Sequence, residues 1–298
     1  MPPLSLGDQP PEVLQLLADS RRVHTPCGPG QLVWHLWGQP HAERPALVLL
    51  HGGSGSWTHW LRNIEALVAA GRWILVPDLP GFGDSDLPPG GRDADAMPEP
   101  LEQGLRSLVG SSVCELVGFS FGGLVAGLWA QAFAERFSRL VLLGPPGLGR
   151  PAIERIRPQA WRHLSEPADR LRMHTHNLRE LMLHQHDAAS PLACQLQQLN
   201  AERDRLPSRR LARTDILARA LQQLHCPVHL LYGEHDRYYL HQHREIEAVL
   251  RSCPGFVAMR AIAGAGHWAQ FEQAHAFHAA LFEALDERVH AGQSVPCP

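Results

Sequence analysis

The sequence carries little net charge and few of the signals that mark secreted, membrane or nucleic-acid-binding proteins. Its 298 residues have a formal net charge of -3, which gives no long-range attraction to nucleic acid or to an anionic membrane. The first ten residues hold neither a basic nor an apolar segment, so we expect no secretory signal. No apolar run approaches the roughly 20 residues of a membrane-spanning helix. These absences predict a cytoplasmic protein without nucleic acid or membrane partners.

Cysteines are few, and their spacing excludes the common cysteine-based sites. None of the six forms a C-x-x-C pair or a zinc-finger spacing, so we expect free thiols. Several histidines gather in the second half of the chain, but spacings of two residues suit neither a helical metal-binding pair nor a zinc signature. These are His163, His174, His176, His184 and His186. We therefore expect no metal and no cofactor.

Apolar strand candidates alternate with helical segments along most of the chain. This rhythm predicts an α/β fold with a mostly parallel sheet, flanked by helices and preceded by a hairpin at residues 22–38. Strands are expected at 46–50, 73–76, 113–117, 139–143, 228–232 and 256–262, and helices at 11–20, 58–70 and 99–109. The strand signal is missing from 148 to 224. We expect a core domain formed by residues 1–147 and 225–298, with residues 148–224 inserted as a helical lid.

The most informative segment is the run at residues 118–123, which reads Gly-Phe-Ser-Phe-Gly-Gly between a predicted strand and a predicted helix. A strand that turns sharply into a helix strains the corner residue, and Gly118 and Gly122 remove the side chains that would collide there. Ser120 then stands exposed above the sheet. A glycine-rich loop without chemistry is the alternative, but the flanking strand and helix favour a G-x-S-x-G nucleophile elbow.

Two backbone amides are candidates for stabilising an oxyanion beside Ser120. One belongs to Phe121, at the start of the helix that follows the serine. The other belongs to Gly53, in the glycine-rich segment 51–57 after the first buried strand. A plain strand-to-helix turn is the alternative interpretation of that segment. Phosphate binding is disfavoured, because neither G-x-x-x-x-G-K nor a clean G-x-G-x-x-G is present.

A carboxylate and a histidine follow the serine in chain order. Asp236 lies in the turn after the strand at 228–232, at the edge of the sheet where such folds keep their chemistry. Glu234 is the alternative acid, and capping of the next helix is the alternative role of Asp236. His267 lies on a glycine-rich loop after the last predicted strand. Because a serine nucleophile needs a base held in one tautomer by a carboxylate, we expect Ser120, Asp236 and His267 to form a catalytic triad.

With these motifs, the chain resembles the α/β-hydrolase superfamily over essentially residues 30–286. Within it, the chain is most similar to the meta-cleavage product hydrolases, which cut a carbon–carbon bond in vinylogous 1,5-diketones from aromatic ring cleavage. The matching stretches are residues 51–53, 143–149 and 266–272, the last of which reads Gly-His-Trp-Ala-Gln-Phe-Glu. The resemblance implies an α/β-hydrolase fold with an inserted lid and serine-dependent hydrolysis of a small molecule.

Two positions depart from the pattern of that subgroup. The subgroup has an asparagine directly before the nucleophile, and this chain has Phe119 there. The subgroup also has an arginine in the lid that binds the dienoate carboxylate. At about that place this chain has Asn200, and Arg203 is the next arginine along the chain. Relatives of the subgroup cleave ordinary carboxylic esters with the same machinery. We therefore favour an ester of a small, largely apolar or aromatic substrate, cleaved through an acyl-enzyme. Carbon–carbon cleavage of a 2-hydroxy-6-oxo-dienoate is the alternative.

The substrate pocket is expected to be lined by Phe119, Phe121, Trp161, Leu181 and Trp268, any of which could instead be a core residue. A basic run between residues 203 and 213 is typical of a solvated helix face. It consists of Arg203, Arg205, Arg209, Arg210 and Arg213. Alternatively, one of these arginines meets a substrate carboxylate, such as that of a monoester of a dicarboxylic acid.

Other functions of the same fold fit the sequence less well. A ligand receptor of this fold usually has a damaged triad, and all three triad positions are intact here. A haloalkane dehalogenase would have an aspartate in place of Ser120. Perhydrolase or haloperoxidase-like behaviour is a common side activity of such a triad, and halide specificity leaves no visible trace in the sequence. Association into a homo-oligomer stays open.

Overall fold

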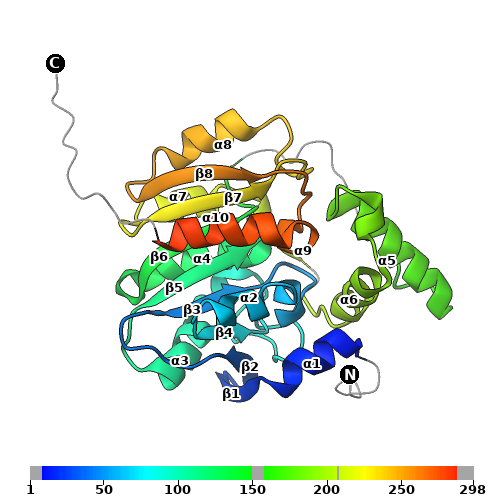
Figure 1. The fold of residues 1–298 in the computed structure, drawn as a ribbon, viewed down its shortest axis with the longest axis horizontal. Coiled ribbons are helices and arrows are strands. Elements are labelled where there is room, and N and C mark those ends of the chain that lie inside the picture. Colours follow the sequence, from blue (N-terminus) through cyan, green and yellow to red (C-terminus); the bar gives the residue numbers. More distant parts are fainter. Residues whose placement is uncertain (1–8, 150–157, 207, 287–298) are drawn as a thin grey trace.

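The computed structural model describes residues 9–149, 158–206 and 208–286, which are organised around a single mixed sheet (Figure 1). In these residues the sheet has eight strands in the order β1-β2-β4-β3-β5-β6-β7-β8. β2 is antiparallel to β1 and β4, and the pairs from β4 to β8 are parallel. The strands are β1 (Arg21–Cys27), β2 (Gly30–Trp37), β3 (Ala46–Leu50), β4 (Ile74–Pro77), β5 (Cys114–Phe119), β6 (Phe137–Leu143), β7 (Val228–Gly233) and β8 (Phe256–Ile262). The expected fold class is confirmed.

Helices cover both faces of the sheet, as expected for a largely parallel sheet whose central strands are mostly apolar. The core on one face includes side chains of α3 (Pro98–Val109), α4 (Phe121–Ala132), α7 (Ile216–Leu221) and α8 (His243–Leu250). The core on the other face includes side chains of α1 (Pro11–Ala18), α2 (Ile64–Ala69), α9 (Ala269–Glu272) and α10 (Ala274–Asp286). Burial of each such Leu, Val or Phe side chain contributes about 1.5–3 kcal/mol of transfer free energy, which holds the sheet edge rigid beneath the site.

The strands lie close to the apolar runs that predicted them, but the helix expected at 58–70 is divided. A 3-10 helix at Trp57–Trp60 precedes α2, and an irregular turn separates the two. The Ser56 hydroxyl accepts a hydrogen bond from the amide of Thr58, and the amide of Trp57 donates to Asp78 at 2.9 Å. These two contacts hold the 3-10 turn against the loop that contains Asp78.

Two helices, α5 (Pro167–Leu181) and α6 (Pro191–Glu202), lie between β6 and β7 in the chain and pack against each other beside the sheet (Figure 1). No strand occurs in this part of the described residues, 158–206 and 208–224. Residues 150–157 and 207 of the expected lid lie outside the described ranges. α7 packs against α4 instead, where a Cβ added to Gly127 would collide with Leu217. The boundaries of the lid stay a prediction.

The basic run after α6 fastens this segment to the turn at residues 78–86. Arg203 forms an ion pair with Asp84, and the Arg205 guanidinium donates to the carbonyls of Phe82 and Gly83 at 3.2 and 3.1 Å. A guanidinium presents several donors in a rigid fork, so it can satisfy neighbouring carbonyls at once. These two arginines therefore have partners in the fold itself.

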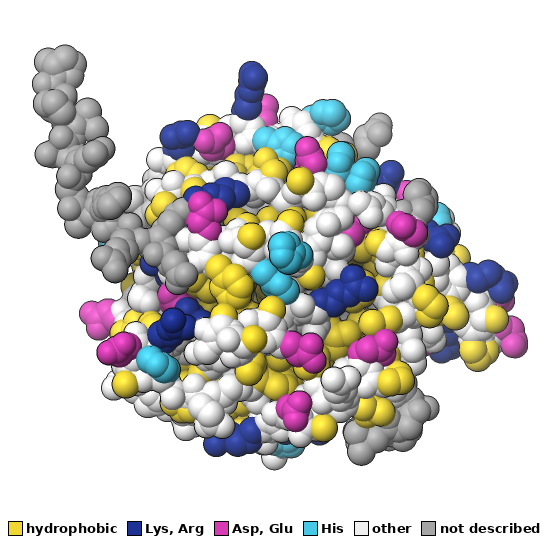
Figure 2. All heavy atoms as spheres, viewed as in Figure 1, with side chains coloured by type: hydrophobic (Ala, Val, Ile, Leu, Met, Phe, Trp, Pro, Cys, Tyr) yellow, Lys and Arg dark blue, Asp and Glu magenta, His cyan; other side chains and the backbone are white. Residues whose placement is uncertain are grey.

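Charged side chains of both signs alternate on the face of the molecule shown in Figure 2, and neither sign gathers into a broad patch there. None of the helices in the described part of the chain is long and apolar enough to cross a membrane. The described residues also hold no group of three or more His, Cys, Asp or Glu side chains arranged to bind a metal ion.

Candidate active site

Ser120 lies at the corner between β5 and α4. Its backbone has φ 50° and ψ -120°, a region that L-residues rarely adopt and that stores strain. A Cβ on Gly118 would come within 2.5 Å of the carbonyl oxygen of Gly122, and a Cβ on Gly122 would collide with the backbone of His51. Only glycine fits at these two positions, so the tight corner holds the Ser120 side chain above the sheet edge.

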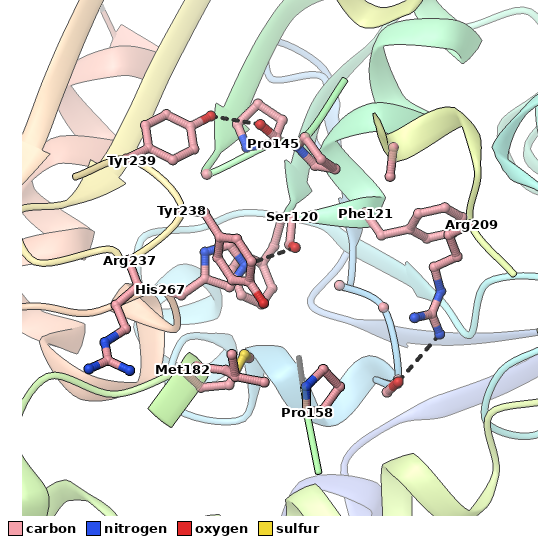
Figure 3. Close-up of a pocket in the computed structure, with 18 of the residues that line it drawn as sticks. Ser120, Phe121, Pro145, Pro158, Met182, Arg209, Arg237, Tyr238, Tyr239 and His267 are labelled. Carbon is pink, nitrogen blue, oxygen red and sulfur yellow. Dashed lines mark hydrogen bonds between the residues drawn. The ribbon is translucent and has the colours of Figure 1, made fainter. Parts of the chain in front are cut away.

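The structure brings the three expected triad side chains together in one line of hydrogen bonds. Figure 3 shows the bond between Ser120 and His267. The His267 Nε2 lies 2.8 Å from the Ser120 Oγ, and its Nδ1 lies 2.7 Å from the Asp236 Oδ2. The second oxygen of Asp236 accepts a hydrogen bond from the amide of Tyr238 at 2.9 Å. Because the buried carboxylate binds the Nδ1 proton, the Nε2 is left free to accept the proton of the serine hydroxyl.

Glu234, the alternative acid, has other contacts. Its carboxylate accepts a hydrogen bond from the amide of Gly264 at 3.0 Å and lies 3.6 Å from the ring of His235. Its side chain is also 53% exposed, whereas that of Asp236 is fully buried. The alternative role of Asp236, capping of the next helix, is wrong: α8 begins at His243, and its N-cap residue is Gln242. The bond from the Tyr238 amide to Asp236 lies in the turn before that helix, and it leaves the second carboxylate oxygen for His267.

The two amides expected to bind an oxyanion lie beside Ser120 on two different segments, the start of α4 and the loop after β3. Phe121 is the first residue of α4, and Gly53 lines the same cavity as the serine. A Cβ built on Gly52 would lie 3.2 Å from the Cβ of Ser120, which shows how closely this loop approaches. Within the described ranges, neither amide donates a hydrogen bond to another protein group. Both are therefore available to a ligand.

The serine opens into a cavity of about 700 Å³ between the sheet edge and the segment that contains α5 and α6. Four of the five expected lining residues contribute to its wall, namely Phe119, Phe121, Trp161 and Leu181. Other apolar wall residues are Leu148, Pro158, Met182 and Ala212. This volume and wall suit a small, largely apolar molecule.

Three other expected binding residues do not line this cavity. Asn200 is buried, where its Oδ1 accepts from Ser56 at 2.7 Å and its Nδ2 donates to Thr58 at 3.0 Å. Arg203 is held by its ion pair with an aspartate, as described above. Trp268 is fully buried, and its indole N–H donates to a backbone carbonyl of the 3-10 helix at 3.0 Å. All three serve the fold in this structure.

Arg209, which belongs to the basic run at residues 203–213, lines the cavity, whereas Asn200 and Arg203 do not (Figure 3). A Cβ added to Gly53 would lie 3.1 Å from the guanidinium carbon of Arg209, and this carbon lies 5.5 Å from the centre of the Phe121 ring. The guanidinium pairs with Asp204 and donates to Ser54 at 3.3 Å. Its Nε has no hydrogen-bond partner among the described residues. Sequence reasoning included Arg209 in a run of five arginines but had no signal to single it out.

Tyr238 is a cavity residue that the sequence analysis missed. Its ring lies edge-on to the His267 imidazole, with centroids 4.8 Å apart (Figure 3). Tyr238 is 41% exposed, and partial desolvation of its phenol, followed by the negative charge of Asp236, raises the pKa of that group above its ordinary value. The hydroxyl therefore stays neutral and can donate a hydrogen bond at neutral pH. Its position two residues after the triad acid is the signal that could have pointed to it.

A sequence model described as the alpha/beta hydrolase fold matches residues 45–274. The chain belongs to the α/β-hydrolase family. A stretch of 107 residues is 36% identical to a 2-hydroxy-6-oxo-6-phenylhexa-2,4-dienoate hydrolase of Burkholderia cepacia, covering 35% of this chain and 37% of that one. A protein of the same name from Comamonas testosteroni is 27% identical over 262 residues, or 83% of this chain and 89% of the relative.

The fold is also that of a solved carboxylesterase from Bacillus subtilis, with a TM-score of 0.70 and 20% identity over 93% of this chain and 97% of the other. An identity this low shows the shared fold alone. Together, the family and the named relatives support a hydrolase. They leave open whether this α/β-hydrolase cleaves an ester or a carbon–carbon bond.

Proposed function

We propose that this protein is a serine hydrolase that cleaves a carboxylic ester of a small, largely apolar or aromatic substrate through an acyl-enzyme. The observation that supports it is the continuous hydrogen-bonded line from Ser120 through His267 to the buried Asp236. The Ser120 hydroxyl, a weak nucleophile, lies 2.8 Å from the His267 Nε2, which is the base. The Nδ1 of the same ring lies 2.7 Å from the Asp236 carboxylate, which orients it. This is the arrangement that activates a serine hydroxyl.

In the first half of the proposed reaction, His267 takes the Ser120 proton as the Oγ attacks the ester carbonyl. The negative charge that develops on the carbonyl oxygen is bound by the amides of Phe121 and Gly53. Each such donor typically contributes a factor of about 10²–10³ to kcat. His267 then gives its proton to the departing alcohol, which leaves an acyl group on Ser120.

In the second half, His267 removes a proton from water, and the resulting hydroxide attacks the acyl carbon. The same two amides bind the second oxyanion, and the proton returns to Ser120 as the acid leaves. We propose that α5 and α6 act as a lid in both halves, because residues of both helices line the cavity above the serine. A lid of this kind excludes bulk water and strengthens the polar contacts inside.

The choice of an ester rests on the residue before the nucleophile. Carbon–carbon hydrolysis of a dienol first requires conversion to the keto form, and this step needs polar groups along the conjugated chain. Phe119 is fully buried and offers a hydrocarbon ring at that place. An ester needs only a polarised carbonyl beside an apolar pocket.

Arg209 favours a substrate that carries a carboxylate in addition to the ester. Its guanidinium lies in the cavity wall beside Gly53, where it pairs with Asp204, and its buried Nε has no hydrogen-bond partner in the described chain. A charge-assisted hydrogen bond to a carboxylate is about twice as strong as a neutral one. A monoester of an aromatic dicarboxylic acid would satisfy both the apolar wall and this arginine.

Carbon–carbon hydrolysis remains the second candidate, because the two relatives named above are dienoate hydrolases. The test is to measure kcat/KM of the purified enzyme for a p-nitrophenyl ester series, an aromatic monoester and a 2-hydroxy-6-oxo-dienoate under one set of conditions. We expect at least one ester to exceed the dienoate. A higher kcat/KM for the dienoate than for every ester would reverse the assignment.

A further inference from the structure

We propose that His59 is a positioning residue which, together with His51, holds the oxyanion-binding peptide between Gly52 and Gly53 in its productive orientation. This inference rests on the proposed function, since it assigns a role to side chains that support the Gly53 amide. Neither histidine touches the serine in the structure, and the triad does not use them.

Both backbone groups of Gly52 are bound by imidazole rings. The amide of Gly52 donates to the Nδ1 of His59 at 3.1 Å, and the carbonyl of Gly52 lies 2.8 Å from the Nδ1 of His51. The Nε2 of His51 is in turn 2.8 Å from the amide of Leu79, which donates to it. The loop is therefore tied on one side to the turn after β4 and on the other to the 3-10 helix at Trp57–Trp60.

These contacts assign opposite tautomers to the two rings. A backbone amide can only donate, so the His51 Nε2 and the His59 Nδ1 are both acceptors. A neutral His51 then carries its proton on Nδ1 and donates it to the Gly52 carbonyl, whereas a neutral His59 carries its proton on Nε2. Protonation of either ring would place an N–H group against a backbone N–H group.

Burial keeps both rings in the neutral form that this arrangement requires. Desolvation lowers the pKa of His51 despite the nearby carboxylate of Asp78. Desolvation also lowers the pKa of His59 well below its ordinary value, and the neighbouring rings of His51 and His267 add to the effect. Arg209 further opposes protonation of His51, and Asp204 favours it. The acceptor nitrogens are thus present throughout the neutral pH range.

Holding the Gly52 carbonyl also fixes the direction of the Gly53 amide. The peptide bond between them is trans, so its N–H and its C=O point in opposite directions. With the carbonyl bonded to His51, the Gly53 N–H faces the other way, toward the cavity that Gly53 lines. A hydrogen bond to the carbonyl also polarises the peptide and strengthens its N–H as a donor.

The packing around His59 leaves the ring no alternative position. It lies between Phe119 and Trp268, with ring centroids 5.4 and 5.1 Å away. A Cβ on Gly55 would overlap the imidazole, so the loop lies directly against the ring. His59 therefore connects the residue before the nucleophile, the residue after the catalytic histidine and the oxyanion loop.

The test compares two variants of the same shape, His59→Leu and His59→Asn. The Asn Oδ1 occupies nearly the place of the imidazole Nδ1 and keeps the acceptor for the Gly52 amide, whereas Leu has none. Because displacement of a group near the reacting centre by about 1 Å can cost 10²-fold in rate, we expect His59→Leu to lose about tenfold or more in kcat, with KM changed less than about threefold. The rate of inactivation by a fluorophosphonate, which forms an oxyanion-like adduct, should fall in parallel. His59→Asn should restore most of both rates.

Equal activity of the Leu and Asn variants, whether both retained or both lost, would overturn the inference. A second measurement needs no substitution: in wild-type protein with ¹⁵N-labelled histidine, His51 should show the Nδ1–H tautomer and His59 the Nε2–H tautomer at pH 7. The reverse assignment, or rapid exchange between tautomers, would overturn it as well. Full activity of a Ser120→Ala variant would instead contradict the proposed function itself, so the two failures are distinguishable.

Discussion

The ring of Phe119 packs against the imidazole of His267, with centroids 5.1 Å apart and an interplanar angle of 43°. Phe119 is fully buried, and its ring also contacts His59. The proposed general base, His267, therefore has a hydrocarbon surface beside it. Such a surface holds the imidazole in place, and it offers no hydrogen bond to a conjugated enolate.

Replacement of Asp236 by Asn should lower kcat about 10⁴-fold while the protein stays folded. The amide would leave the His267 Nδ1 without a carboxylate, and the imidazole would then adopt the wrong tautomer toward Ser120. Steady-state kinetics with an activated ester measures the loss, and circular dichroism checks the fold. Glu234→Gln is the control, since Glu234 bonds to Gly264 and not to the histidine. A silent Asp236 change combined with a damaging Glu234 change would show that the wrong carboxylate was chosen.

Replacement of Arg209 by Gln should raise KM for an aromatic monoester by about tenfold or more, because a charge-assisted hydrogen bond contributes about 1.5–3 kcal/mol. KM for the corresponding neutral diester should change less than about threefold. Side-by-side kinetics on the two substrates gives the ratio. Arg203→Gln is the matched control, because Arg203 pairs with Asp84 outside the cavity and should not discriminate between the substrates. An equal effect of the Arg209 change on both esters would remove Arg209 from substrate recognition.

The strands and the three triad positions were within reach of sequence reasoning because their signals are local. β3 is an unbroken apolar run, and β5 is apolar apart from Glu115. Glycines lie close to the end of each strand, at positions 52 and 53 after β3 and at positions 118 and 122 around the corner after β5. Asp236 and His267 come just after β7 and β8, where a parallel sheet collects its loops on one edge. The order of elements along the chain was enough to predict that these side chains meet.

The side chains that line the cavity could not be predicted from the sequence, because their positions depend on contacts between segments that are distant along the chain. Arg209 differs from Arg203 only in what it meets: Gly53 lies 156 positions earlier in the chain than Arg209, and Asp84 lies 119 positions earlier than Arg203. Asn200 is taken up by the hydroxyls of Ser56 and Thr58, which no pattern around residue 200 indicates. Side chains on the helical segment between β6 and β7 are placed by tertiary packing, so the local sequence pattern is a weak guide to their contacts.

Several buried histidines should make the protein less stable in mild acid. Desolvation lowers the pKa of His35 and of His174 from the ordinary 6.5 to about 4. For His35, the charge of Asp78 only partly opposes this shift, and those of Arg22 and His24 add to it. Between pH 6.5 and 4 the unfolded chain therefore binds more protons than the folded one, so stability is fully present above pH 6.5 and falls as the pH decreases.

Thermal unfolding measured from pH 8 to pH 4.5 should show this decrease as a falling Tm. His35→Phe keeps an aromatic ring against Trp37 and Trp57 and cannot be protonated, so its Tm should depend less steeply on pH. His176→Phe, on the exposed side of α5, serves as a control with an unchanged slope. Identical slopes for the His35 variant and the wild-type protein would show that this ring does not contribute.

The central claim, an acyl-enzyme on Ser120, is tested most directly by labelling the enzyme and locating the adduct by mass spectrometry. A fluorophosphonate should add one equivalent to the intact protein, and peptide mapping should place it on Ser120. Ser120→Ala should take up no label and should hydrolyse esters about 10³- to 10⁶-fold more slowly. An adduct on another residue, or wild-type kcat in Ser120→Ala, would contradict the account.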